Sequence, residues 1–399
     1  MTYPTLNEIV LAITLLLTIS AVMIPLARRL GIGPELGLLL SGVILGSSHM
    51  LGQTQVARLR DISELGIVFF LFVIGLELDL KKLWSLRRYA IALGSLQVLG
   101  TGLVLMFYWH LFFPSWGLAL LLGLLLSNSS TAQVLQLLHE KDELDEEHGR
   151  AAFSVVLFQD LTVVPIMALI PVLAGTGSAE SISWWSAVPA LGVMFIVFLA
   201  GRYVCPWLFR FAIARDMTET FTAVVFVAIL GSAWLASSVG LSMALGAFLM
   251  GVALSGTEDR GRLQEKVLPF KDLFLGLFFV SVGLSINLSV LEGHTAKILV
   301  HVVVIVLAKI AVLYVAARVL KIGHRPAARV SFLLAQGSEF GFVVLSALLV
   351  AGVGTPIQFA SGIMVIALTM LLTPWLDRLG IMVSRLPRLE RETSRLPIP

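Results

Sequence analysis

The sequence predicts an all-α, polytopic membrane protein with about thirteen transmembrane helices. Of its 399 residues, 58% are hydrophobic and only 13% are charged, whereas soluble domains contain about 25% charged residues. The apolar residues gather in long runs that are separated by short polar connections. The basic residues lie almost entirely in alternate connections, as they do when a chain crosses a bilayer repeatedly.

Thirteen apolar runs are candidate spans, because a helix needs about 20 mostly apolar residues to cross a bilayer. They cover residues 6–26, 32–48, 62–80, 89–109, 116–138, 151–174, 185–208, 218–236, 240–255, 270–288, 296–319, 327–350 and 356–378. The second and ninth runs are short for a straight helix. We expect one transmembrane unit over residues 1–399, with no soluble domain.

The first run is expected to remain in the mature protein. No basic residue precedes it, and Arg28 and Arg29 follow it, which is the reverse of a cleavable signal peptide. Cys205 is the only cysteine, so the sequence excludes a disulfide framework and a cysteine-based metal cluster.

The basic residues predict the orientation of the chain. Of the 28 lysines and arginines, 24 fall in loops on one side of the predicted bundle. Three lie on the other side (Arg58, Arg60 and Lys297), and Lys309 lies within a run. By the positive-inside rule the N-terminus is outside and the C-terminus is in the cytoplasm, which requires an odd number of spans.

The chain also repeats itself at a separation of 208 or 209 positions. The matched pairs include Gly42 with Gly251, Gly75 with Gly283, Asn128 with Gln336, and Ser130 with Ser338. Because the separation spans seven helices, the two halves should have opposite topology, as in many transporters. We therefore expect inverted six-helix repeats over residues 1–174 and 215–380, a linker helix over 175–214, and a short cytoplasmic tail over 381–399.

Two polar clusters interrupt corresponding helices of these halves. The first consists of Ser127, Asn128, Ser129, Ser130 and Thr131, and the second of Gln336, Gly337, Ser338 and Glu339. Small polar residues can simply let helices pack closely, but two clusters at matching positions favour broken helices whose unwound backbone binds an ion. The expected cation ligands are Asn128, Ser129, Ser130, Thr131, Gln336, Ser338 and Glu339, together with Gln159 and Asp160. Glu339 could instead have the structural role of stabilising the second break.

Asp160 and Lys309 are charged residues near the middle of apolar runs. A charge at the centre of a bilayer costs roughly 2.5–3.5 kcal/mol on insertion scales, and such residues usually have a function. A structural ion pair would also explain both residues. We expect Asp160 to carry the cation or the proton, with Lys309 as a candidate partner. No phosphate-binding loop, catalytic triad or nucleic-acid surface is recognisable, so we expect no enzyme activity, cofactor or nucleic-acid partner.

These residues resemble the membrane part of the Kef-type potassium:proton antiporters, in the monovalent cation:proton antiporter superfamily. The matching segments are 66–79, 129–132, 157–160, 276–279, Lys309 and 336–340. The resemblance implies a sodium/proton antiporter-like fold with a dimerising domain, to which the first, second, eighth and ninth helices contribute. The third to sixth and tenth to thirteenth helices would form a moving core, in which broken helices 5 and 12 cross beside Asp160.

The resemblance also implies a function for the pair Gln159 and Asp160, which is typical of potassium exchangers. The expected protein is a homodimeric, elevator-type potassium:proton antiporter of the cell inner membrane, with Asp160, Gln159 and Lys309 central to transport. The alternatives are a sodium:proton antiporter, a channel-like cation conduit, and a membrane subunit or sensor that does not transport. We expect no regulatory nucleotide-binding domain in this chain, since no Gly-x-Gly-x-x-Gly motif follows the last run.

Overall fold

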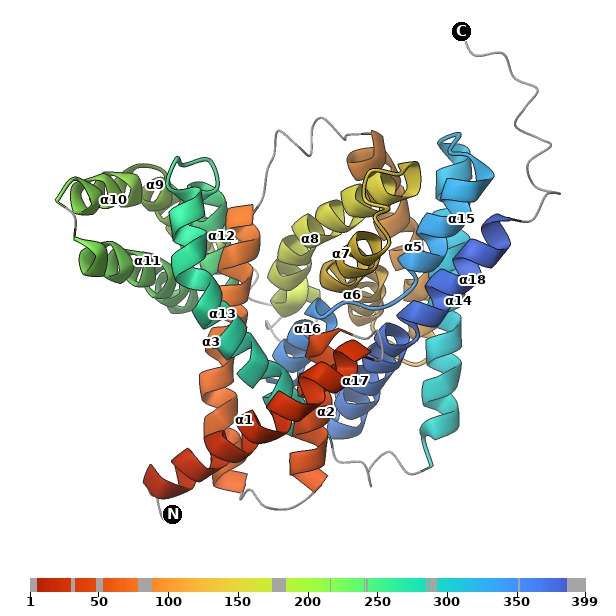
Figure 1. The fold of residues 1–399 in the computed structure, drawn as a ribbon, viewed down its shortest axis with the longest axis horizontal. Coiled ribbons are helices and arrows are strands. Elements are labelled where there is room, and N and C mark those ends of the chain that lie inside the picture. The colour runs from red at the N-terminus through yellow and green to blue at the C-terminus, as the bar shows by residue number, and fades with distance from the viewer. Residues whose placement is uncertain are drawn as a thin grey trace, which may run out of the picture. The chain divides into compact units, whose positions relative to one another are not determined.

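The fold was obtained as a computed structural model, and every regular element in the part that it describes is a helix (Figure 1). The described residues are 6–29, 33–47, 53–77, 88–173, 184–215, 217–239, 241, 243–284, 286, 293–350 and 352–385. The α-helices are α1 (Leu6–Arg29), α2 (Pro34–Ser47), α3 (Gln53–Glu77), α5 (Gly94–His110), α6 (Trp116–Ser127), α7 (Thr131–Glu140), α8 (Glu147–Leu173), α9 (Trp184–Leu199), α10 (Cys205–Ala214), α11 (Thr218–Ser238), α12 (Met243–Leu254), α13 (Arg260–Leu284), α14 (Thr295–Val319), α15 (His324–Leu333), α16 (Phe340–Val350), α17 (Pro356–Leu371) and α18 (Thr373–Ser384). Two π-helical segments, η1 (Arg88–Leu93) and η2 (Ala200–Val204), precede α5 and α10.

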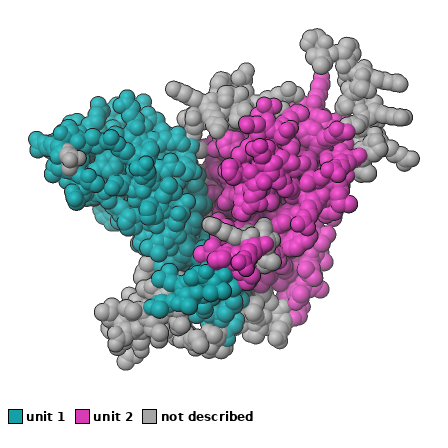
Figure 2. Space-filling view, viewed as in Figure 1, with its two compact units in different colours: residues 1–23, 38–80, 177–287 teal, residues 24–37, 81–176, 288–399 magenta. Residues whose placement is uncertain are grey.

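The chain divides into two compact units (Figure 2). Unit 1 comprises Met1–Met23, Leu38–Leu80 and Gly177–Asn287, and unit 2 comprises Ile24–Gly37, Lys81–Thr176 and Leu288–Pro399. Unit 1 therefore contains α3 and α9 to α13, whereas unit 2 contains α5 to α8 and α14 to α18. Every residue of the expected cation site belongs to unit 2.

The thirteen predicted runs all coincide with helical segments. Six helices in the described part of the chain are long and apolar enough to cross a membrane, or seven if α17 and α18 form one bent span. Five further apolar helices are shorter than a full span. The prediction of a multi-pass helical protein is confirmed, while the count of thirteen spans stays a prediction.

Prolines divide two runs that were predicted to be single helices. The run at 356–378 is bent by 48° between α17 and α18, where Pro374 occupies the first turn of α18. The run at 185–208 changes from α-helix to π-helix over η2, and Pro206 occupies the first turn of α10. Proline has no backbone N–H and its ring clashes with the preceding turn, so a continuous α-helix is lost at both places.

In unit 1, α3 packs against α12 and α13 through glycines. A Cβ on Gly75 would clash with the carbonyl oxygen of Phe248, and it would lie 3.2 Å from the carbonyl carbon of Gly251. Gly42 meets Gly283 in the same way, with 2.9 Å from its would-be Cβ to the Gly283 Cα. The repeat matches Gly42 to Gly251 and Gly75 to Gly283, so the contact between Gly42 and Gly283 in one half corresponds to the contact between Gly251 and Gly75 in the other. The repeat itself stays a prediction.

The glycine contacts also explain a difference from the expected grouping of helices. The resemblance implied that α3 and α13, the third and tenth helices, belong to the moving core. In the structure they pack together within unit 1, where Gly66 of α3 lies directly against the backbone of Phe274 of α13. Without a side chain at Gly66 the two backbones approach closely, which favours this pairing.

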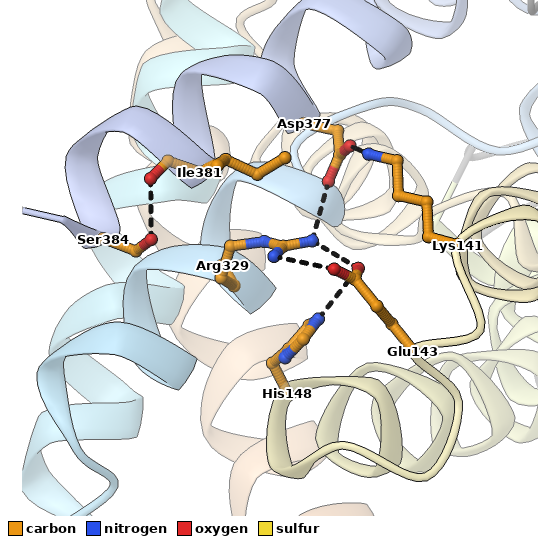
Figure 3. Close-up of polar contacts among 7 residues, drawn as sticks. All are labelled: Lys141, Glu143, His148, Arg329, Asp377, Ile381 and Ser384. Atoms are coloured by element: carbon orange, nitrogen blue, oxygen red, sulfur yellow. Dashed lines mark hydrogen bonds and ion pairs between the residues drawn. The ribbon is translucent and has the colours of Figure 1, made fainter.

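In unit 2, an ionic cluster around the buried Asp377 joins the loop between α7 and α8 to α15 and α18 (Figure 3). Arg329 of α15 donates to both carboxylate oxygens of Glu143, at 3.2 and 2.5 Å, and lies 3.5 Å from Asp377 of α18. Lys141 pairs with the other oxygen of Asp377, and His148 lies 3.2 Å from Glu143. The side chain of Asp377 is only 3% exposed. The cluster therefore connects helices through a buried carboxylate and differs from an ion pair that is fully solvated at the surface.

This cluster predicts an acid-sensitive stability. Burial alone would raise the pKa of Glu143, but hydrogen bonds from Arg329 and His148 outweigh it and hold that pKa below its ordinary value. A group with a lowered folded pKa stabilises the protein above its unfolded pKa of about 4.3, and the contribution disappears as the pH falls further. We expect Glu143→Gln to lower the melting temperature in detergent at pH 7 and to have little effect near pH 3.

Glu146→Gln is the matched control, because Glu146 is exposed in the same loop. Its melting temperature should follow that of the unaltered protein at both pH values. An equal loss of stability at pH 7 and pH 3 in Glu143→Gln would contradict an ionic role for Glu143.

Candidate cation site

Two broken helices meet in unit 2, as the sequence predicted. The first break lies between the end of α6 at Ser127 and the start of α7 at Thr131, and the second lies between α15 and α16. The backbone N–H of Ser130 donates to the carbonyl oxygen of Gly337 at 3.0 Å, so the two breaks are in direct contact. The breaks thus place two helix C-termini and two helix N-termini close together.

The polar side chains of each break stabilise the helices that flank it. The hydroxyl of Ser130 accepts from the backbone N–H of Gln133 at 3.4 Å, which caps α7. The hydroxyl of Ser338 accepts from the N–H of Phe340 at 3.3 Å, at the start of α16. Serine is favoured at such positions because its side chain satisfies an N–H that has no partner within the helix. Ser130 and Ser338, predicted as cation ligands, act in this structure as helix caps.

Lys309 of α14 joins the two breaks. The residue is 1% exposed. Its ammonium donates to the carbonyl oxygens of Asn128 at 2.6 Å and Gln336 at 2.5 Å, and to the Ser129 hydroxyl at 3.0 Å. Both carbonyls follow helix C-termini, where the helix dipole attracts a positive charge. An ammonium has three donors, so none remains for a hydrogen bond to Asp160 in this structure.

Asp160 lies on α8 at the N-terminus of α7. The Thr131 hydroxyl is 3.0 Å from one carboxylate oxygen of Asp160 and 3.1 Å from the other. Asp160 is partly exposed, unlike the buried Lys309. A carboxylate beside a helix N-terminus is electrostatically favoured, and its partial exposure allows a cation or a proton to reach it.

Gln159 is fully buried and its amide is already occupied. Its Oε1 accepts from the backbone N–H of Ser129 at 2.9 Å. Its Nε2 donates to Gln97 Oε1 at 2.7 Å and to the carbonyl oxygen of Ser127 at 3.4 Å. In this structure the amide of Gln159 links the first break to α8, and its role as a cation ligand stays a prediction.

Replacing Gln159 with leucine is expected to destabilise the protein by roughly 1–3 kcal/mol, because buried groups of Ser129 and Gln97 would lose their partner. Gln136→Leu is the control, since Gln136 bonds Glu140 on the exposed side of α7. Equilibrium unfolding in detergent measures both free energies. Equal stabilities of the two variants would refute the structural role of Gln159.

Several buried polar atoms at the crossing have no hydrogen-bond partner among the described residues. They are Oε1 and Nε2 of Gln336, Nδ2 of Asn128 and Oε2 of Glu339. Each buried unpaired group costs about 1–3 kcal/mol. Stable proteins rarely keep several such groups together. The two oxygens can accept from water or bind a partly dehydrated cation, and the two amide nitrogens can donate to water.

Glu339 adds a second carboxylate to this region. It is 5% exposed and stands directly before α16. The carboxylate of Glu35, in the first turn of α2, is close enough to interact with it electrostatically. A ligand role and a structural role both remain compatible with this position.

The predicted site residues thus fall into three groups. Thr131 contacts Asp160 directly. Lys309 donates to Asn128, Ser129 and Gln336. The residues that lie at the breaks or hold them in place are Ser130, Ser338, Gln159 and Glu339. The sequence reasoning missed Gln97, Glu35 and Thr162, whose hydroxyl lies 3.2 Å from Asn128 Oδ1. Gln97 and Glu35 could have been found, because each is an isolated polar residue in an apolar run. Within the described part of the chain, no group of three or more His, Cys, Asp or Glu residues is placed to hold a metal ion.

Comparison with known proteins places this geometry in a family. The family model described as "Sodium/hydrogen exchanger, transmembrane" matches residues 14–378. Among solved structures, the chain is similar to the sodium proton antiporter MjNhaP1 from Methanocaldococcus jannaschii at pH 8, with 17% identity and a TM-score of 0.70 over 96% of this chain and 100% of that one. It is also similar to a structure of MjNhaP1 from an electron-microscopy map, with 16% identity and a TM-score of 0.58 over 96% of this chain and 95% of that one. At these identities the likeness shows a shared fold.

Proposed function

Because the chain belongs to the sodium/hydrogen exchanger family, we propose that it exchanges a monovalent cation for protons with Asp160 as the carrying group. The family consists of transporters, so the chain is an antiporter and not an enzyme. The observation that carries the assignment of Asp160 is its place at the crossing: a partly exposed carboxylate, held by Thr131, beside two broken helices.

The contacts around Asp160 support a competition mechanism. Lys309 donates to the carbonyls of the two breaks. Asp160 is partly exposed whereas Glu339 is buried, so we assign to Asp160 the charge that balances a cation. When a cation binds, the carboxylate must be ionised, and when a proton binds, no cation is held. An elevator-type movement of the core would then expose the loaded carboxylate to each side in turn.

We propose potassium as the cation, on the resemblance of the pair Gln159 and Asp160 to that of potassium exchangers. Sodium is the second candidate, and the likeness of the fold to a sodium proton antiporter favours it. The two candidates share every other part of the mechanism.

Proteoliposomes with an imposed pH gradient test the choice of cation. We expect potassium chloride to collapse the gradient, with sodium chloride much less effective and choline chloride inert. A response to sodium alone would assign a sodium:proton antiporter. A current that persists without any proton movement would refute exchange and indicate a channel-like conduit.

The proposal also covers the location, the orientation and the oligomeric state of the antiporter. We propose an inner-membrane homodimer with its N-terminus outside and its C-terminus in the cytoplasm. The uneven distribution of lysine and arginine supports the orientation. Labelling of single cysteines placed at residues 28 and 297, with the buried Cys205 replaced by serine, would test it.

A further inference from the structure

Unit 2 contains a cavity that adjoins the helix breaks without including the residues assigned to the cation site. Its volume is about 330 Å³, and it is lined by residues of α5, α6, α14, α16 and α17 and of the loops beside them. No residue assigned above to the cation site lines it. Small-molecule sites span roughly 300–1,000 Å³, so the cavity suits a single chain-like ligand and not a large one.

One end of the cavity carries a cation, Lys297. Its lining includes His294, Lys297 and His301, around the start of α14, and none of the described lining residues is acidic. Lys297 is exposed and forms no ion pair with an acidic residue in the described part of the chain. The N-terminus of α14 adds the positive end of its helix dipole, and the side chain of its N-cap residue His294 does not cap it. The polar end of the cavity therefore favours a negatively charged group.

The remainder of the cavity is apolar. Leu122, Leu348 and Ile366 line it and are at most 8% exposed. Phe112 and Ile357 also line it but are 52% and 40% exposed, respectively. Apolar walls thus continue from the buried interior to the surface of unit 2, which is the environment that a hydrocarbon chain requires.

Aromatic residues mark this end of the unit as a membrane–water interface. They gather where α5 ends and α6 begins, and they are Tyr108, Trp109, Phe112, Phe113 and Trp116. Tryptophan and tyrosine concentrate at the level of lipid headgroups. A basic group at that depth lies within reach of a lipid phosphate.

We propose that this cavity binds one acyl chain of an anionic phospholipid, with the lipid phosphate held by Lys297. The chain would lie against Leu122, Leu348 and Ile366, and the second acyl chain would stay in the bilayer. The occupant is a membrane lipid rather than a soluble anion, because most of the lining is apolar and its exposed part includes the large apolar side chains of Phe112 and Ile357.

Native mass spectrometry of the purified, delipidated chain tests the headgroup contact. We expect phosphatidylglycerol to bind more tightly than phosphatidylcholine with the same acyl chains. Lys297→Gln should weaken phosphatidylglycerol roughly five-fold, as expected for the loss of one interfacial lysine. Arg385→Gln, which removes an exposed cation from the end of α18 outside the cavity, should leave the affinity unchanged. Equal affinities for the two lipids, or equal effects of the two substitutions, would overturn the headgroup assignment.

A photoreactive phosphatidylglycerol with its diazirine on the acyl chain tests the chain position. Crosslinks should fall on α6, α16 and α17, and Ser361→Phe, which fills the cavity from a partly buried lining position, should abolish them while the melting temperature shows that the variant is folded. Crosslinks that persist in folded Ser361→Phe would overturn the proposal. Displacement of the lipid by inorganic phosphate at equal concentration would do so too, because it would assign a soluble anion.

Discussion

Asp160→Asn is expected to reduce cation-coupled proton exchange to the level of empty vesicles. Asparagine keeps the shape of the side chain and can still accept a hydrogen bond from Thr131, which lies 3.0 Å from the carboxylate. It cannot ionise, so it neither balances the charge of a cation nor releases a proton. The measurement is the cation-induced collapse of a pH gradient in proteoliposomes, with potassium and sodium tested separately.

Asp145→Asn is the matched control, because Asp145 is an exposed acid in the loop between α7 and α8. It should exchange at the rate of the unaltered protein. Residual exchange above one tenth of the normal rate in a folded Asp160→Asn protein would show that another group carries the ion. Glu339 would then be the next carboxylate to test, since it is buried at the same crossing.

Lys309→Met is expected to lower the free energy of unfolding by about 3 kcal/mol and to abolish exchange. The carbonyls of Asn128 and Gln336 would lose their donor, and a buried acceptor left without a partner costs about 1–3 kcal/mol. The loss is large because one side chain satisfies both breaks. Removal of the buried charge itself offsets part of the cost. Equilibrium unfolding in detergent and the proteoliposome assay measure the two effects.

Lys266→Met provides the comparison, since Lys266 is partly exposed on α13 and forms no hydrogen bond or ion pair within the described residues. It should change neither stability nor exchange. Lys309→Arg should recover part of the stability, because a guanidinium can also donate to both carbonyls. If Lys309→Met were as stable as Lys266→Met, the ammonium would have no structural role at the crossing.

The two helix breaks were predictable from the sequence because their cause is local. Ser127 to Ser130 and Gln336 to Glu339 place small polar residues within apolar runs, and such residues compete with the backbone for hydrogen bonds and favour helix ends. The positions of Asp160 and Lys309 within membrane spans could also be predicted, because each residue lies near the middle of an apolar run that is long enough to cross a bilayer. These features depend on residues close together in the chain.

The partners of each side chain were not predictable. Lys309 was a candidate partner of Asp160, and in the structure it donates to the carbonyls of residues 128 and 336, which lie far from it in sequence. Gln159 was expected to face the ion but is held by Ser129 and Gln97. A pattern of residues shows that a polar group is buried, but the choice among several nearby donors and acceptors depends on tertiary packing.

The sequence alone thus established a multi-pass helical protein, its broken helices and the acid at its centre, because hydrophobic run length and local helix breaking are properties of neighbouring residues. Only the tertiary structure assigned the roles of those polar residues. Asp160 is partly exposed and accepts a hydrogen bond from Thr131, whereas Lys309 and Gln159 form hydrogen bonds within the breaks. The physical reason is that a buried polar group must be paired, and which group pairs with it depends on how distant segments come together.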